Sequence, residues 1–436
     1  MNGNMLVIMS DEHQSRAMGC AGHSFVKTPN LDRLAARGMR FTNAYTPSPI
    51  CVPARAAFAT GRYPHQNRLW DNAMPYTGTI PGWGHALQRA GIPVESIGKL
   101  HYRDEKDPAG FDKEHIPMQV VDGVGMVWGS VRREDERIEG PSRMLGEYIG
   151  PGESNYTRYD ATVTAKTVEW LGRQRNQQRT SPWCLYVGLV APHFPLVVPQ
   201  EFYDMYPHSI LPEVKQHPNT GYKQHPWIEK TDAPMHTEGK FKNAEERLCA
   251  MACYYALCTY MDDNVGQIMS ALEDNNLLDS TTIVYTSDHG DNVGARGLWG
   301  KSNLYEESCA VPLIMAGPDV SAGECETPVS LLDLSVTIAD HFDQTIEADV
   351  EHGAPIGDNL MEIANQPYDA SRVVFSEYHA IGSVSGAFMI RKGHWKYNYY
   401  VGFEPELFNL HEDPEETVNV AASHADIVAL LHAELL

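Results

Sequence analysis

The chain has 436 residues and carries 57 acidic against 34 basic side chains, which gives a formal net charge of −23 at neutral pH. This charge argues against a general nucleic-acid binder, which needs basic patches to offset phosphate. No run of about 18 apolar residues occurs, so we expect no membrane-spanning helix. The length suits one large α/β domain with an appendage, or two to three ordinary domains.

The N-terminal residues and the cysteines predict a cytoplasmic protein. Met1–Asn4 leads directly into the apolar run Met5–Met9, with no basic region before it, and that run is too short for a signal sequence. The eight cysteines show neither a paired extracellular spacing nor a C-x-x-C zinc pattern. We therefore expect free thiols in a reducing compartment.

Strands and helices alternate along most of the chain. Short apolar runs predict strands at Met5–Met9, Met39–Tyr45, Val94–Ile97, Trp183–Val190, Thr282–Thr286 and Val311–Ala316. Helical patterns fall between Thr28 and Gly38 and at Trp83–Ala90, Ala161–Leu171 and Ala244–Leu272. The repeated alternation predicts an α/β fold, with a large and mostly parallel sheet sandwiched by helices.

Two segments depart from this alternation. Pro195–Lys242 is rich in Pro, His, Tyr and Trp and lacks a clear period, which favours a functional insertion such as a wall over the active site. After about Asp369 the pattern changes to short antiparallel strands, expected at Val373–Tyr378, Gly386–Arg391, Trp395–Tyr400 and Glu406–Asn409, with a helix from about His424. We therefore expect a catalytic domain over residues 1–368 and a small C-terminal α+β subdomain over 369–436. The oligomeric state stays open, a homo-oligomer included.

Acidic residues follow two of the predicted strands. Asp11 lies at the carboxyl end of Met5–Met9, and Asp288-His289 lies at that end of Thr282–Thr286. A single Asp at a strand end is also typical of a turn or a helix cap. Open parallel sheets, however, place ligands beyond the carboxyl ends of their strands, so the two sites together predict a divalent-cation site. Because oxygen ligands dominate, we expect a hard ion, Ca²⁺ first, with Mn²⁺ or Mg²⁺ as alternatives.

The segment Cys51–Arg55 reads C-x-P-x-R and is followed by Thr60-Gly61-Arg62. A cysteine taken alone is usually a small buried hydrophobic residue. Pro53, however, suits the first turn of a helix through Ala54–Ala59, which would place Cys51 at a helix N-terminus that favours an anion. The spacing resembles the signature of the type I sulfatases, in which a separate enzyme oxidises this cysteine to formylglycine.

The resemblance to type I sulfatases continues in the same order along nearly the whole chain. The matching segments are Ser10–Glu12, Thr28–Asp32, Gly98–His101, Pro192–Pro195, Thr286–Gly290, Gly297–Lys301, Tyr305–Ser308, Leu407–Leu410 and Asp413–Asn419. The resemblance implies the fold of the alkaline phosphatase superfamily. It also implies hydrolysis of a sulfate monoester, with aryl sulfates as model substrates, by a hydrated formylglycine that attacks sulfur.

Carried over residue by residue, the resemblance implies a metal set and a catalytic set. The metal set is Asp11, Cys51 as formylglycine, Asp288 and His289, together with Glu12, which stands where many members have a second Asp. Glu12 is expected either to bind the cation through its longer side chain or to lie behind the ligands. The catalytic set is Cys51, Arg55, Lys99, His101, His193 and Lys301. In it Arg55 steadies the aldehyde hydrate, and the lysines and histidines surround the sulfate and serve the leaving group.

Three functions stay open at this stage. The first is a sulfatase that is matured by a formylglycine-generating enzyme and acts on a small anionic sulfate ester. The second is a phosphonate monoester or phosphodiester hydrolase built on the same formylglycine site. The third is an unmodified, catalytically silent anion-binding protein, which would keep an intact thiol at Cys51. Neither a nucleic acid nor a membrane is expected as a partner.

Overall fold

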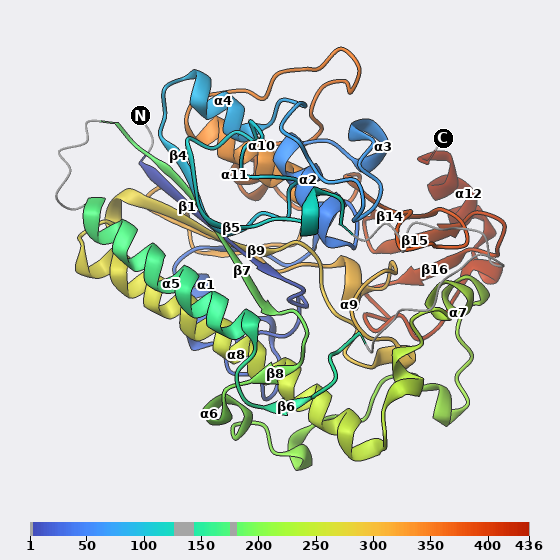
Figure 1. Ribbon diagram of the computed structural model, residues 1–436. Coiled ribbons are helices and arrows are strands. Elements are labelled where there is room, and N and C mark those ends of the chain that lie inside the picture. Colours follow the sequence, from blue (N-terminus) through green and yellow to red (C-terminus); the bar gives the residue numbers. More distant parts are fainter. Residues whose placement is uncertain (1–2, 126–143, 175–180, 436) are drawn as a thin grey trace.

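The computed structural model describes residues 3–125, 144–174 and 181–435, and its centre is an eight-stranded sheet (Figure 1). The strands follow the order β11-β2-β10-β9-β1-β7-β4-β5. Their bounds are β1 (Asn4–Asp11), β2 (Met39–Phe41), β4 (Val94–Lys99), β5 (Lys113–Met118), β7 (Cys184–Pro192), β9 (Thr281–Ser287), β10 (Leu313–Ala316) and β11 (Gly323–Cys325).

The middle of the sheet is parallel. β1 pairs in parallel with β7 on one side and β9 on the other, so that Leu6 lies opposite Leu185 and Ile283. β4 continues the parallel arrangement between β7 and β5. β10 instead runs antiparallel to both β9 and β2. The predicted mostly parallel sheet is therefore confirmed, with one reversed strand near an edge.

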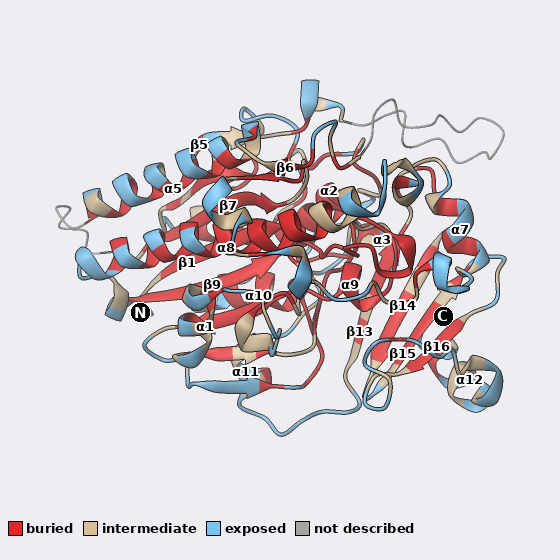
Figure 2. Ribbon diagram, turned by 90° about the horizontal axis from the view of Figure 1, so that it is seen from below, coloured by how far each residue is buried: buried red, intermediate tan, exposed pale blue. Residues whose placement is uncertain are grey.

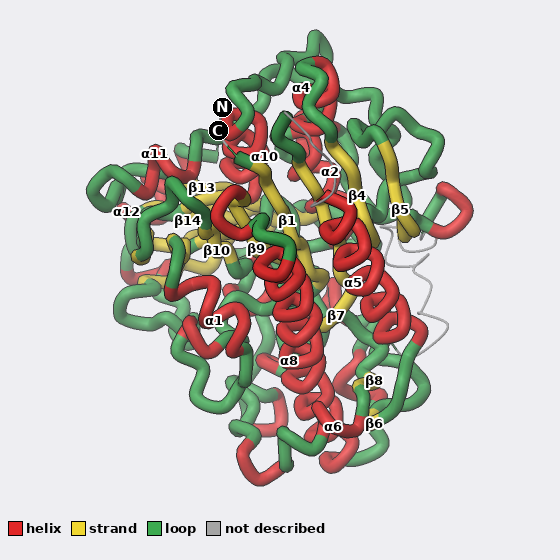
Figure 3. The backbone as a smooth tube through the Cα atoms, turned by 90° about the vertical axis from the view of Figure 1, so that its left-hand side faces the viewer, coloured by secondary structure: helices red, strands yellow, loops and turns green. Residues whose placement is uncertain are grey.

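Helices cover both faces of the sheet, and alternate residues of β1 enter two different cores. Leu6 and Ile8 pack in the core beneath the first group of helices, namely α1 (Pro29–Ala36), α5 (Asn155–Gln174) and α8 (Ala244–Asp274) (Figure 3). Met5 and Val7 belong to the opposite core, beneath α2 (Cys51–Thr60), α4 (Trp83–Arg89) and α10 (Leu331–His341). The central strands are accordingly buried on both sides (Figure 2).

Smaller elements complete the large domain. They are the paired strands β3 (Ala44–Tyr45) and β12 (Val329–Ser330), the paired strands β6 (Gly150–Pro151) and β8 (Val197–Val198), and the helices α3 (Pro64–Asn67), α6 (Gln200–Tyr203), α7 (Pro226–Asp232), α9 (Glu306–Cys309) and α11 (Leu360–Ala364). The extended segment expected at Met39–Tyr45 is thus two strands. The insertion expected to be irregular contains two short helices, α6 and α7.

The C-terminal region forms a separate antiparallel sheet beside the large one (Figure 1). Its strands are β13 (Val373–Tyr378), β14 (Ala387–Lys392), β15 (Trp395–Tyr400) and β16 (Glu406–Asn409), and α12 (Ala425–Ala433) follows. The predicted antiparallel subdomain is confirmed. Within the described part of the chain, we find no helix with the length and apolar character needed to cross a membrane.

Candidate active site

The carboxyl ends of the four central strands bring the predicted polar residues to one edge of the sheet. Asp11 ends β1 and Lys99 ends β4, while His193 follows β7 and Asp288 follows β9. These strands are neighbours and run parallel, so their ends meet at the same edge. Residues far apart in the sequence are thereby placed in one site.

Cys51 is the first residue of α2, as the proline spacing predicts. All ten residues of this helix are buried, and no side chain caps the helix at Ile50. One backbone donor is satisfied from elsewhere, because Val52 N–H donates to the side-chain oxygen of Asn72 over 3.0 Å. The N-terminus of α2 therefore points its positive end into the buried site beside the Cys51 side chain.

Four residues form a compact group of potential metal ligands. One ligand atom from each of Asp11, Cys51, Asp288 and His289 lies within 4.8 Å of the others, and all four side chains are buried. His289 Nε2 is 3.1 Å from Cys51 Sγ and 3.6 Å from Asp288 Oδ1. The other ring nitrogen, His289 Nδ1, lies 3.0 Å from Gly290 O, which leaves Nε2 as the free acceptor when Nδ1 carries the proton.

Glu12 lies on the other side of Asp11, in a second group with His193. Its Oε2 accepts a hydrogen bond from Lys301 Nζ over 3.0 Å, and His193 Nε2 is 3.3 Å away. Its Oε1 is buried and has no hydrogen-bond partner within the described residues. Burial raises the pKa of Glu12 well above its ordinary value, although Lys301 acts in the opposite direction.

The guanidinium of Arg55 bridges the carboxylates of Asp11 and Asp288. Its Nε donates to Asp288 Oδ2 over 2.8 Å, and its NH2 donates to Asp11 Oδ2 over 3.0 Å. The remaining nitrogen donates to the hydroxyl of Tyr186 over 3.0 Å and to the backbone oxygen of Lys99 over 3.1 Å. The geometry thus gives Arg55 a task the motif does not reveal, which is to fix the orientation of both carboxylates.

Lysines and histidines surround Cys51. Lys99 Nζ is 2.6 Å from Asp11 Oδ2, and Lys301 Nζ is 2.9 Å from His193 Nε2. Burial acts to raise the pKa of Asp11, yet Lys99 and His193 hold it well below its ordinary value. His101 is half-buried with a positive φ of 60°, and desolvation together with Lys99 lowers its pKa well below the ordinary value.

The thiol of Cys51 is protonated at neutral pH. Burial and the nearby Asp11 raise its pKa to about 12, against the effect of Lys301. A neutral thiol is a weak nucleophile and a weak metal ligand. The unmodified side chain is therefore poorly suited to attack an ester in this environment.

These residues open into one cavity of about 650 Å³. Its lining includes five of the six predicted catalytic side chains, namely Cys51, Lys99, His101, His193 and Lys301. Residues of α7 also line it, so part of the insertion does form a wall of this cavity. The sixth, Arg55, is buried and does not belong to the lining. Sequence reasoning missed Asn72, Tyr186 and the lining residues of α7, for which no local motif gives a signal.

Comparison with known proteins identifies the family. Residues 3–344 match the family model described as "Sulfatase", and residues 294–436 match "N-sulphoglucosamine sulphohydrolase, C-terminal". A choline-sulfatase of Rhizobium meliloti (strain 1021) is 34% identical over 427 residues, which covers 96% of this chain and 82% of that protein. Arylsulfatase K of Danio rerio is 28% identical over 452 residues, covering 97% and 81%.

Solved structures agree on the fold. A phosphonate monoester hydrolase of Agrobacterium radiobacter superposes with a TM-score of 0.77 at 22% identity, over 100% of this chain and 95% of that chain. At this identity the likeness concerns the fold alone. The family model spans most of the chain, and the sulfatase relatives match it over nearly its whole length. The chain therefore belongs to the sulfatase family and is a sulfuric ester hydrolase.

Proposed function

We propose that this protein hydrolyses a sulfate monoester with formylglycine formed from Cys51 and with one divalent cation. The observation that carries the proposal is the buried group of Asp11, Cys51, Asp288 and His289 at the N-terminus of α2. The choline-sulfatase and arylsulfatase relatives support it, and members of the family generally use both a metal and formylglycine.

The donor set fits a divalent cation. Asp11, Asp288 and His289 supply two carboxylates and one imidazole, and the unpartnered buried Oε1 of Glu12 adds an oxygen close by. Buried carboxylates packed this densely need positive charge nearby. We infer Ca²⁺, with Mn²⁺ or Mg²⁺ as alternatives, because oxygen donors outnumber the imidazole. Such an ion would supply Lewis acidity at the sulfate oxygens.

The side chains around Cys51 have separate tasks. Formylglycine supplies, as its hydrate, the hydroxyl that attacks sulfur. Lys99 and Lys301 stabilise the charge on the sulfate oxygens, helped by the N-terminus of α2. We assign proton transfer to the leaving alkoxide to the pair of Lys301 and His193, in which the Lys301 ammonium carries the proton and His193 Nε2 accepts a hydrogen bond from it. His101, which lines the same cavity, is assigned to the hydroxyl at position 51. Arg55 holds the two aspartates in their orientation.

The mass of the tryptic peptide Phe41–Arg55 tests the modification. Protein made together with a formylglycine-generating enzyme should yield a peptide lighter than the cysteine form and reactive towards hydrazide. A plain alkylatable thiol under those conditions would contradict the proposal. Replacing Cys51 with Ala should abolish turnover without loss of the fold, and retained turnover would rule out this nucleophile.

A phosphonate monoester or phosphodiester hydrolase is the alternative for the same site. Turnover of an aryl sulfate and of the matching aryl phosphonate monoester, measured side by side on the modified protein, separates the two. A higher kcat/KM for the sulfate supports the proposal, and the reverse assigns the site to phosphonates. The division at residues 368 and 369 and the cytoplasmic location stay predictions.

A further inference from the structure

The active-site cavity is much larger than a sulfate group. Its volume is about 650 Å³. At roughly 30 Å³ for each group the size of a water molecule, the cavity has room for about twenty non-hydrogen atoms. The sulfate group supplies five of these atoms, so about fifteen remain for the alcohol portion of the substrate. Cavities of this volume enclose most of the surface of a drug-sized ligand.

Apart from the basic residues around Cys51, the lining of the cavity is mainly apolar and aromatic. Three methionines contribute to it, namely Met118, Met144 and Met235. Among the described lining residues, Asp232 is the one with an acidic side chain. Desolvation raises the pKa of Asp232 to about 6, so even this carboxylate lies in poorly hydrated surroundings.

The two tryptophans of the lining use their N–H groups for contacts within the protein. Trp299 Nε1 donates to Glu238 Oε2 over 2.8 Å, and Trp227 Nε1 donates to Ser385 Oγ over 3.1 Å. An indole has one N–H donor and no acceptor. Both tryptophans therefore offer a ligand the surface of their rings rather than a hydrogen bond.

Two amide side chains of the lining are also committed at both of their polar atoms. Gln119 Oε1 accepts from the backbone N–H of Tyr102 over 2.7 Å, and its Nε2 donates to a neighbouring carboxylate over 2.9 Å. Asn303 Oδ1 accepts from the backbone N–H of Tyr305 over 3.0 Å, and its Nδ2 donates to Asn292 Oδ1 over 3.2 Å. These amides leave little capacity to bind the hydroxyl groups of a ligand.

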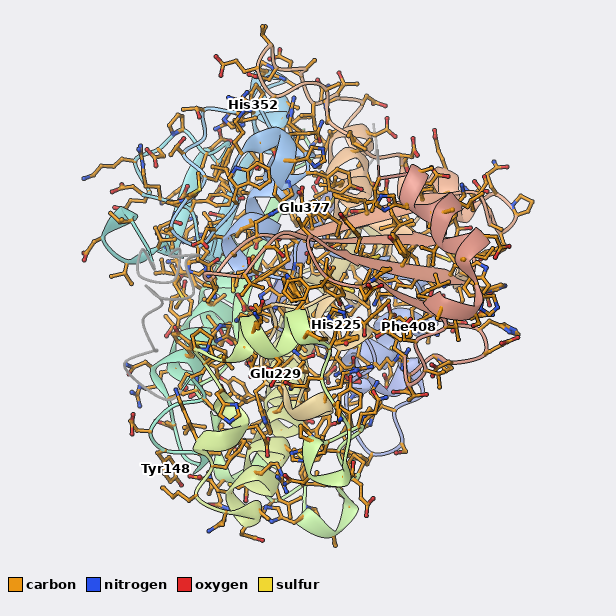
Figure 4. The ribbon with its side chains drawn as sticks, turned by 90° about the vertical axis from the view of Figure 1, so that its right-hand side faces the viewer. Tyr148, His225, Glu229, His352, Glu377 and Phe408 are labelled. Carbon is orange, nitrogen blue, oxygen red and sulfur yellow. The ribbon has the colours of Figure 1, made fainter. Side chains whose placement is uncertain are left out.

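Helix α7 holds its part of the apolar lining, Trp227 and Ile228, against the C-terminal sheet. The Trp227 ring packs on Tyr400 with centroids 5.0 Å apart. His225, which precedes the helix, stacks on Tyr400 and lies 2.9 Å from Glu404 O through Nε2 (Figure 4). These contacts fix the start of the helix, so the apolar surface that it presents is held in place.

We propose that the alcohol portion of the substrate is bulky and apolar, and that the aromatic and methionine side chains of the lining bind it without hydrogen bonds. The proposal rests on the sulfatase function proposed above. It names the substrate class as sulfate esters of long-chain or polycyclic alcohols. The sulfate of such an ester lies among the basic residues around Cys51, and its hydrocarbon portion fills the rest of the cavity.

Other alcohols fit this lining less well. A sugar loses the hydrogen bonds that its hydroxyl groups make to water, and the committed amides and indoles do not replace them. A small amino alcohol fills only a minor part of the space beyond the sulfate. An apolar alcohol gains from every methylene that leaves water, and the flexible methionines adapt to its shape.

The test measures binding, so it does not depend on turnover. The Cys51→Ala protein is titrated by calorimetry, in the presence of Ca²⁺, with alkyl sulfates from ethyl to octyl. We expect the affinity to rise about threefold for each added methylene, and so at least about hundredfold over the series. Glucose 6-sulfate and choline sulfate are the reference ligands, and both should bind more weakly than octyl sulfate.

Methionine variants locate the effect. The double variant Met118→Gln and Met235→Gln replaces two thioethers of the lining with amides of similar length. The gain from ethyl to octyl sulfate should fall at least about tenfold in it, because an alkyl chain covers the amides without hydrogen-bonding to them. Unchanged binding of ethyl sulfate shows that the fold and the sulfate end of the site are intact. Met361→Gln makes the same exchange in a separate cavity beside α11 and should leave the series unchanged.

Three results would overturn the proposal: an affinity that does not rise with chain length, tighter binding of either reference ligand than of octyl sulfate, or a gain that the double variant keeps in full. Turnover of an aryl sulfate by the formylglycine form is measured separately. Absence of that turnover would reject the sulfatase function and leave the binding result readable.

Discussion

Replacing Arg55 with Met removes the guanidinium that joins two buried aspartates but keeps an unbranched side chain. The guanidinium is 1% exposed and lies 2.8 Å from Asp288 Oδ2 and 3.0 Å from Asp11 Oδ2. Removing one partner of a buried ion pair costs about 3–5 kcal/mol, because an uncompensated charge is left in the interior. Both pairs share this one guanidinium, so their contributions do not add. We expect the free energy of unfolding of the metal-free protein to fall by about 3–5 kcal/mol.

Urea unfolding in the presence of EDTA, followed by tryptophan fluorescence, measures this loss. Arg89→Met is the matched control, since Arg89 pairs with Glu347 at 3.3 Å on the surface, where such pairs contribute about 1 kcal/mol or less. Added Ca²⁺ should restore part of the loss in Arg55→Met, because it neutralises the same carboxylates and binds the folded state. Equal losses in the two variants, or no loss in Arg55→Met, would refute this account of the site.

Three further predictions concern other parts of the site and its support. Asp288→Asn should lose both the bound divalent cation and turnover, and unchanged metal content by elemental analysis would remove Asp288 from the ligands. Burial raises the pKa of Asp160 from 3.8 to about 7, so the folded protein keeps a proton that the unfolded chain loses. The free energy of unfolding of the protein, minus that of its Asp160→Asn variant, should therefore fall by at most about 4 kcal/mol as pH rises from about 4 to about 7, and stay constant at higher pH. A difference that does not change with pH would contradict the shift in pKa. Glu238 accepts a hydrogen bond over 2.8 Å from the indole N–H of Trp299, which lines the cavity. Glu238→Ala should therefore raise KM about three- to tenfold with little change in kcat. An unchanged KM would show that Glu238 does not position Trp299 for substrate binding.

The clearest strand signals in the sequence were uninterrupted apolar runs. Met5–Met9 and Trp183–Val190 are such runs, and both lie in the middle of the sheet as β1 and β7. β5, at Lys113–Met118, escaped prediction because it is an edge strand with mostly unburied side chains, and it includes a proline. The antiparallel direction of β10 was also unpredictable, since apolar content does not encode strand direction.

Local structure at the site could be predicted where its signal lies within a short motif. The position of Cys51 at a helix N-terminus follows from Pro53 two residues later, and the structure confirms it. Contacts between distant segments gave no such signal. Arg55 and Asp288 are 233 residues apart, and their hydrogen bond depends on the register of β9 beside β1. Whether Arg55 also steadies the hydrate stays a prediction.

The net charge of −23 means that this acidic protein repels an anionic substrate unless positive charge at the site outweighs the repulsion. Each cation expected to attract sulfate is already paired with a carboxylate: Lys99 with Asp11, Arg55 with Asp11 and Asp288, and Lys301 with Glu12. Three formal positive charges therefore cancel three formal negative ones. With a divalent cation in place the same group would carry a surplus of two positive charges, deep in a low-dielectric interior where they act strongly. We therefore expect sulfate recognition by this acidic protein to depend less on its lysines than on a bound divalent cation that offsets the charge of their carboxylate partners.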